Sequence, residues 1–258
     1  MLSLVDMKKS FQLNAKSQIK QTIAIMSSKG GVGKSTVTAL LAVELSRNGK
    51  KVGILDADII GPTISRLFAT QAKVVGQDGF ILPVSSALGI RFISSQLLLD
   101  QSDDPIVWRS PLVLDLIRQF YVDVIWGDLD YLFIDLPPGT GDVPMTVLES
   151  LNVNNIIMVT TPQDLVQDIV AKGIQMAKMV NKPILGIIEN YSYFICDQCQ
   201  KQHALFHTSD RPSIWQKYQL PLLAQLPLDS ALPKLIDSGK IETIEMDGIR
   251  QFIQSWRF

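Results

Sequence analysis

Short apolar segments alternate with stretches of helical periodicity along most of this chain. Runs rich in β-branched residues, such as "QTIAIMSS" (21–28) and "DYLFIDL" (130–136), are typical of buried strands. Further strands are expected at residues 51–58, 155–161, 183–190 and 222–228. Apolar residues at helical spacing predict helices at residues 35–50, 110–124 and 163–180. Because strands that are apolar throughout need cover on both faces, the pattern predicts an α/β fold with a single doubly wound, mostly parallel sheet and helices on both faces.

Two segments depart from this alternation. Residues 74–84, "VVGQDGFILPV", predict a hairpin, since the Asp78-Gly79 pair favours a tight turn. Residues 1–20 precede the first expected strand and are expected to form a mobile N-terminal arm. No repeat, low-complexity tract or linker interrupts the rest, so residues 21–258 are expected to form one domain, which includes a cysteine-containing segment at 191–207.

Composition narrows the range of possible partners. The 258 residues carry a net charge of −1, so no basic excess indicates a nucleic-acid partner. No apolar run is long enough to suggest a membrane span, and residues 1–20 lack the continuous hydrophobic segment of a secretory signal. Two cysteines do not make a disulfide framework for a chain of this length. A reducing, cytoplasmic setting is therefore expected.

A glycine-rich loop, "SKGGVGKST" (28–36), lies between the first expected strand and the first expected helix. Glycines allow successive backbone N–H groups to converge on a phosphate, and the helix N-terminus adds a positive dipole. Lys34 would neutralise the β- and γ-phosphates, and the Ser35 hydroxyl would ligate Mg²⁺. The residues expected to contact the nucleotide here are Ser28, Lys29, Gly30, Gly31, Val32, Gly33, Lys34, Ser35 and Thr36. The intact Gly33-Lys34-Ser35 disfavours the alternative, a turn that merely joins strand to helix.

Three aspartates follow expected strands, at the sheet edge where ligands bind. Asp56 and Asp58 end one strand, and Asp135 ends another. Asp135 is expected to hold Mg²⁺ through water, and Asp56 to lie nearer the metal than Asp58, which is expected to orient the attacking water. Residues 139–141 would then form a mobile loop that senses the γ-phosphate. Taken alone, each aspartate could instead be a helix N-cap or a solvated strand end.

These segments resemble the Mrp/ApbC family of iron–sulfur cluster carrier ATPases over about residues 20 to 240. The matching motifs are "KGGVGKST", "LDADIIGPTI", "VWRSPLV", "WGDLDYLFIDLPPGTGD", "TTPQDLVQDIVAKGIQM" and "GIIENYSYFICDQC". Lys29 also resembles the signature lysine of the deviant Walker A class, which includes ParA, MinD and nitrogenase iron protein. The resemblance implies a MinD/ParA-like P-loop NTPase fold, and a homodimer in which Lys29 reaches the partner's nucleotide.

The resemblance also implies site residues outside the loop. Asn190 would contact the adenine of ATP. Cys196 and Cys199 would combine with the same residues of a second subunit to bridge one 4Fe-4S cluster. The chain departs from the family pattern after these cysteines, where Gln200 and Phe206-His207 stand in place of the usual Gly and Phe-Gly.

Both cysteines and both histidines of the chain lie within "CDQCQKQHALFH" (196–207). Cys196 and Cys199 could form a thiol redox pair, but that motif ordinarily opens a helix beside a thioredoxin-like sheet. With His203 and His207 they could bind zinc, although the second loop is shorter than in the usual two-Cys, two-His fingers. They could also be inert thiols. A cluster shared across a two-fold axis is favoured, because each subunit then supplies two of the four thiolates and His203 is a bystander or an outer hydrogen-bond donor.

We therefore expect a slow, Mg²⁺-dependent ATPase that carries a labile 4Fe-4S cluster between a cluster donor and recipient apo-proteins. The alternative is a ParA- or MinD-type positioning switch whose cysteines bind zinc or no metal. A MinD-like switch needs a C-terminal amphipathic membrane helix, and residues 248–258 place Ile249, Phe252, Ile253 and Trp256 on one helical face. The polar face carries few charges for membrane attraction, so this helix is expected to dock on the core.

Overall fold

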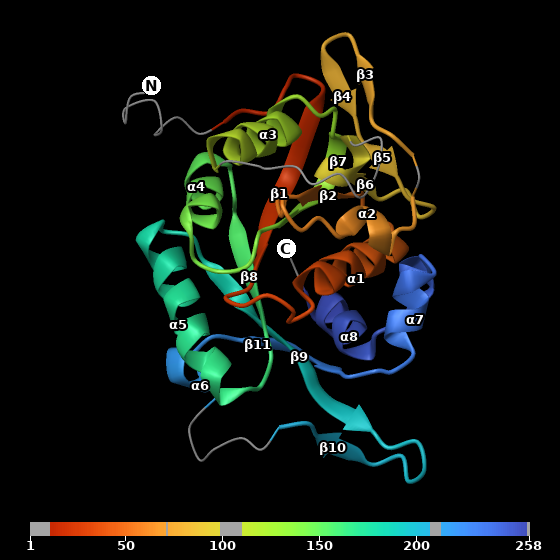
Figure 1. Ribbon diagram of the computed structural model, residues 1–258, viewed down its shortest axis with the longest axis vertical. Helices are drawn as coiled ribbons and strands as arrows, with labels where there is room; N and C mark the ends of the chain where they lie inside the picture. Colours follow the sequence, from red (N-terminus) through yellow and green to blue (C-terminus); the bar gives the residue numbers. More distant parts are fainter. Residues whose placement is uncertain (1–10, 71, 99–109, 207–212, 257–258) are drawn as a thin grey trace.

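The expected strands assemble into one nine-stranded sheet in the computed structural model, which describes residues 11–70, 72–98, 110–206 and 213–256 (Figure 1). The strand order is β10-β9-β8-β1-β7-β2-β6-β5, and β11 pairs with β9. The pairs of β1 with β7 and β8, of β2 with β6 and β7, and of β9 with β8 and β11 are parallel. Only β5–β6 and β9–β10 are antiparallel among the described pairs of this sheet. The predicted α/β fold with one mostly parallel sheet is confirmed.

The bounds of the elements follow the apolar pattern closely. The strands are β1 (Ser17–Met26), β2 (Val52–Asp56), β3 (Val75–Gln77), β4 (Phe80–Leu82), β5 (Val84–Ser85), β6 (Arg91–Ile93), β7 (Gly127–Asp135), β8 (Asn155–Thr160), β9 (Ile184–Ile195), β10 (Gln202–Ala204) and β11 (Leu222–Pro227). The α-helices are α1 (Lys34–Arg47), α2 (Ile64–Leu67), α3 (Ser110–Val122), α4 (Asp142–Ser150), α5 (Asp164–Met179), α6 (Ile214–Tyr218), α7 (Leu232–Asp237) and α8 (Asp247–Ser255). Two 3₁₀ helices are Ser95–Leu98 and Ile241–Thr243.

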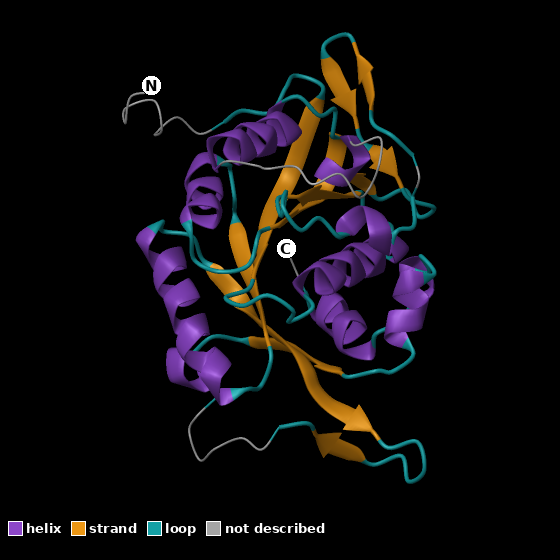
Figure 2. Cartoon of the chain, viewed as in Figure 1, coloured by secondary structure: helices purple, strands orange, loops and turns teal. Residues whose placement is uncertain are grey.

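Helices cover both faces of the sheet, as predicted (Figure 2). Helices α1, α2, α7 and α8 lie on one side, and α3, α4, α5 and α6 on the other (Figure 1). Consecutive residues of β1 alternate between the two cores: Ile23 and Ile25 belong to the first, Ala24 and Met26 to the second. This double burial explains why the central strands are apolar at every position rather than at every second one.

The first strand begins earlier than the sequence suggested. Strand β1 begins at Ser17, and Ser17 is paired with Gly127 of β7, so the arm predicted for residues 1–20 cannot include residues 17–20. Before the strand, the Asn14 amide donates hydrogen bonds to the carbonyls of Val122 and Val124, at 2.7 and 2.8 Å. The apolar run begins only at residue 21 because the first residues of β1 alternate between exposed and half-buried. Residues 1–10 lie outside the described part of the chain.

The predicted hairpin and the predicted C-terminal helix are both present in the structure. The predicted hairpin is β3–β4, with Asp78 and Gly79 both at positive φ (51° and 80°) in its turn. The C-terminal helix is α8, whose Ile249, Phe252 and Ile253 are buried in the core, so docking on the core is confirmed. Among the described residues, no helix has the length and apolar character that crossing a bilayer requires.

Candidate nucleotide and metal sites

The glycine-rich loop connects β1 to α1 at the carboxyl edge of the sheet. Gly31 and Gly33 adopt positive φ values of 80° and 81°, which side chains rarely tolerate. A Cβ atom at Gly33 would also collide with the Asn190 side chain, whose Nδ2 donates to the Val32 carbonyl at 3.0 Å. The helix begins at Lys34, so its free N–H groups face the loop. Backbone N–H groups and a helix N-terminus fit the phosphates of a nucleotide.

The Asp135 carboxylate contacts the polar side chains at the start of α1. Its carboxylate lies 2.7 Å from Lys34 Nζ and accepts hydrogen bonds from Ser35 Oγ at 2.5 Å and Thr38 Oγ1 at 2.9 Å. Asp135 is fully buried and Lys34 is 6% exposed. A buried carboxylate and a buried ammonium are tolerated because each neutralises the other and further donors satisfy the remaining lone pairs. The fold thus brings together Lys34, Ser35 and Asp135, for which the sequence analysis expected separate roles at the phosphates and at Mg²⁺.

Asp56 lies beside Asp135 because strands β2 and β7 are neighbours in register. The Asp56 carboxylate accepts hydrogen bonds from Ser94 Oγ at 2.9 Å and from the N–H groups of Asp58 and Ile64 at 3.2 and 3.3 Å. Burial and the negative charge of Asp135 raise the pKa of Asp56 to about 7, against the opposing effects of Lys34 and the Ser94 hydrogen bond. Two carboxylates and a serine hydroxyl are hard oxygen donors of the kind that Mg²⁺ prefers, so the residues fit that ion.

Asp58 lies outside this buried cluster. It is partly buried, and its Oδ1 accepts a hydrogen bond from the Gly61 N–H at 3.2 Å. Burial raises its pKa above the usual value, while Lys34 and the Gly61 hydrogen bond oppose the shift. Asp58 lines a cavity of about 240 Å³ together with Pro137, Pro138 and Gly141. It is therefore placed next to the loop that follows Asp135, where a water molecule can reach it.

The remaining residues of the glycine-rich loop differ in exposure. Lys29 and Gly30 are exposed at its outer side, whereas Ser28 is buried and its hydroxyl has no hydrogen-bond partner among the described residues. Thr36 is half-buried in the first turn of α1. The exposed Lys29 side chain can contact a group outside this chain.

Three polar groups of this site were not recognised in the sequence. Thr38 and Ser94 donate to the buried aspartates, and the Ser27 carbonyl accepts from the Gly139 N–H at 2.8 Å, which ties the glycine-rich loop to residues 139–141. Thr38 could have been found, because it lies one helical turn after Lys34 and on the same face. Ser94 carries no such signal, because only the neighbouring position of β6 brings it to Asp56.

The cysteines lie on a hairpin at the far end of β9. Cys196 follows the strand, Cys199 is in the turn, and β10 returns antiparallel, with His203 opposite Phe194. Cys199 is exposed and Cys196 partly so. Hydrogen bonds from the N–H groups of Cys199 and Gln198 lower the pKa of the Cys196 thiol. A thiol with a lowered pKa is more readily the thiolate that binds metals. His207 lies outside the described residues.

Comparison with known proteins places these two sites in a family context. The family described as "ParA: NUBPL iron-transfer P-loop NTPase" matches residues 18–254, which hold both the glycine-rich loop and the cysteine hairpin. The chain belongs to this family. It is therefore a P-loop NTPase, and the resemblance inferred from its motifs is confirmed.

Individual relatives of this chain are named for iron–sulfur cluster carriage or assembly. The iron-sulfur cluster carrier protein of Clostridium perfringens is 40% identical over 232 residues, which cover 87% of this chain and 81% of that protein. The protein of the same name from Methanocaldococcus jannaschii is 44% identical over 226 residues, covering 86% and 78% of the two chains. A cytosolic Fe-S cluster assembly factor NUBP2 homolog from Trichoplax adhaerens is 44% identical over 233 residues and 88% of each chain.

Solved structures share the fold of this P-loop NTPase. A nucleotide-binding protein from Archaeoglobus fulgidus, in complex with ADP, superposes with a TM-score of 0.80 at 45% identity, over 91% of this chain and 92% of that one. The cell division ATPase MinD of Pyrococcus furiosus superposes with a TM-score of 0.64 at 20% identity, over 91% and 98%. The predicted MinD/ParA-like fold is confirmed by these superpositions.

Proposed function

We propose that this chain is a slow, Mg²⁺-dependent ATPase that carries a 4Fe-4S cluster as cargo at the interface of a homodimer. The cluster would come from a donor protein and pass to recipient apo-proteins, in the cytoplasm. One observation carries the proposal: the glycine-rich loop and the hairpin with Cys196 and Cys199 both lie beyond the carboxyl ends of strands of one sheet. The names of the relatives, which specify iron–sulfur cluster carriage, support the same function.

The nucleotide would be held by the loop and its first helical turn. Lys34 can exchange its carboxylate partner, Asp135, for the phosphates, which are also anionic. Ser35 would then bind Mg²⁺ directly, while Asp135 and Asp56 bind it through water. The bound ion would offset the negative charge of the phosphates. Asn190, whose side chain donates a hydrogen bond to the Val32 carbonyl of the loop, would contact the adenine.

Asp58 would orient the attacking water, because of Asp56, Asp58 and Asp135 it is the one that is not buried. Asp58→Ala is expected to leave ATP affinity within about twofold and to lower kcat by about 10²-fold or more, since water positioning acts in the transition state rather than in the ground state. Phosphate release measured at saturating ATP tests this. Hydrolysis at the wild-type rate in Asp58→Ala would show that another group orients the water.

The proposed homodimer would form over the sheet edge that carries both sites. Large apolar side chains are exposed there: Ile60 is 75% exposed beside Asp58, and Phe194 and Ile195 are 37% and 49% exposed beside the cysteines. Exposed apolar side chains near functional groups are typical of interaction surfaces. A partner on this edge would bring its own Lys29 towards the nucleotide and its own cysteines towards Cys196 and Cys199.

Mixing two inactive variants tests whether Lys29 acts in trans. In a dimer of one Lys29→Ala and one Lys34→Ala subunit, the competent loop belongs to the Lys29→Ala subunit and receives Lys29 from its partner. We expect such mixtures to recover part of the hydrolysis that each variant lacks alone. Mixed dimers that form but stay inactive would mean that Lys29 acts on its own subunit's nucleotide.

Anaerobic reconstitution tests the cargo. The full chain, incubated with iron and sulfide and freed of excess, is expected to retain about four irons and four sulfides per dimer, as two pairs of thiolates require. The measurement is iron and sulfide quantitation together with the size of the complex. Colourless protein without iron would contradict the carrier function and leave a ParA- or MinD-type ATPase.

A further inference from the structure

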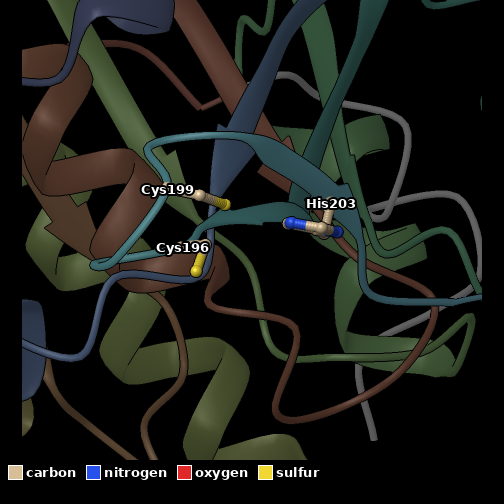
Figure 3. A group of neighbouring side chains, drawn as sticks. All are labelled: Cys196, Cys199 and His203. Carbon is tan, nitrogen blue, oxygen red and sulfur yellow. The ribbon is translucent and has the colours of Figure 1, made fainter.

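One hairpin brings three metal-binding side chains together within a single subunit. The sulfurs of Cys196 and Cys199 and one imidazole nitrogen of His203 all lie within 4.8 Å of one another. Figure 3 shows the cysteines on the turn and His203 on the returning strand, with a ring nitrogen on the side of the sulfurs. His203 thus lies among the candidate ligands rather than apart from them as a bystander.

The hairpin holds these side chains through bonds of its own backbone. The Gln200 N–H donates to the Cys196 carbonyl at 2.8 Å, and the Cys196 N–H donates to the Lys201 carbonyl at 3.0 Å. The His203 ring stacks on Phe194, with the ring centroids 5.2 Å apart and the planes at 18°. Because the turn and the ring plane are both fixed, little conformational freedom remains to be lost when a metal binds.

The separation of the ligand atoms distinguishes a single ion from a cluster. Around one tetrahedral ion with bonds of about 2.0–2.3 Å, neighbouring ligand atoms are about 3.3–3.8 Å apart. If the three ligand atoms of the hairpin moved closer together by about 1 Å, they would occupy three corners of such a tetrahedron. Cysteines that bind different irons of a four-iron cluster stand farther apart, because two metal–sulfur bonds and a metal–metal separation lie between their sulfurs. The separations of the ligand atoms in the hairpin are therefore closer to those around a single ion than to those around a four-iron cluster.

We propose that each subunit by itself binds one divalent transition-metal ion through Cys196, Cys199 and His203, with the fourth coordination position open. Two sulfurs and an imidazole suit Zn²⁺, Co²⁺ or Fe²⁺ rather than Mg²⁺. The proposal rests on the proposed function in one respect, that the cluster uses the same two thiolates. A bound ion therefore excludes the cluster, and the hairpin must open and release the ion before a cluster is accepted.

Cobalt titration of the metal-free full chain under anaerobic conditions tests the ligand set. We expect one Co²⁺ per subunit, with sulfur-to-cobalt charge-transfer absorption and the intense visible bands of tetrahedral coordination. His203→Ala should weaken Co²⁺ binding about tenfold to a hundredfold or more, since even residues that only orient a ligand cost that much. His203→Cys should restore binding with stronger charge-transfer absorption, because it adds a third thiolate. Gln202→Ala, a change at the adjacent exposed residue, is the matched control and should bind Co²⁺ like the wild type.

Two outcomes would overturn the proposal: unchanged Co²⁺ affinity in His203→Ala, or one Co²⁺ per two subunits. Reconstitution with iron and sulfide distinguishes a failure of the single-ion proposal from a failure of the proposed carrier function. His203→Ala should still take up the cluster, and Zn²⁺ added first should block cluster uptake in the wild type but far less in His203→Ala. Failure of every form to take up a cluster would refute the carrier function alone, because the Co²⁺ result does not depend on it.

Discussion

Lys34→Ala is expected to lower ATP affinity by about a hundredfold or more, because it removes the buried positive charge that would meet the phosphates. Isothermal titration with ATP and Mg²⁺ measures the loss. The same substitution removes the cation from buried Asp135, which keeps hydrogen bonds from Ser35 and Thr38, so the midpoint of thermal unfolding must be measured alongside.

A second lysine–aspartate pair in the same sheet provides the matched control. Lys20 of β1 lies 2.8 Å from Asp130 of β7, but this pair is near the surface and remote from the glycine-rich loop. Lys20→Ala should leave ATP affinity unchanged and barely lower the midpoint of thermal unfolding, because an exposed ion pair is screened by solvent. If folded Lys34→Ala bound ATP as tightly as the wild type, the loop would not be the phosphate site.

Cys196→Ala and Cys199→Ala are each expected to abolish the visible absorbance and the bound iron of the reconstituted dimer. Each substitution removes two of its four thiolates at once, since the dimer carries the change twice. ATP affinity should stay at the wild-type value, because the cysteines lie on the β9–β10 hairpin and not in the glycine-rich loop. Iron quantitation and ATP titration on the same samples check both expectations.

Gln198→Ala is the control for the cysteine substitutions. Gln198 is exposed in the same turn, and its backbone N–H, which helps to lower the pKa of Cys196, survives the substitution. The variant should therefore bind the cluster like the wild type. Retention of four irons per dimer in Cys196→Ala or Cys199→Ala would mean that other groups hold the cargo.

Elements that contribute to the core could be predicted from the sequence, because burial leaves its own pattern. The apolar runs located β1, β2, β7, β8 and β11 to within a few residues, and the helical spacing located α1, α3 and α5. Strand β9 was predicted to end near Asn190 but continues to Ile195. Its last residues pair with short, exposed β10, and this two-stranded extension lies outside the core, so burial leaves no pattern that marks it as a strand.

The glycine-rich loop, its Lys34 and Ser35, the aspartates at strand ends and the Cys-x-x-Cys pair were determined by the sequence itself. Each depends on residues that are close along the chain, so local spacing carries the chemistry. Only the tertiary structure decided which of these groups meet. The order of β7 next to β2 places Asp56 against Asp135, the end of β6 adds Ser94, and the return of β10 along β9 carries His203 to the cysteines. These encounters depend on strand order and register, which follow from packing of the whole sheet and leave no mark at any single position of the sequence.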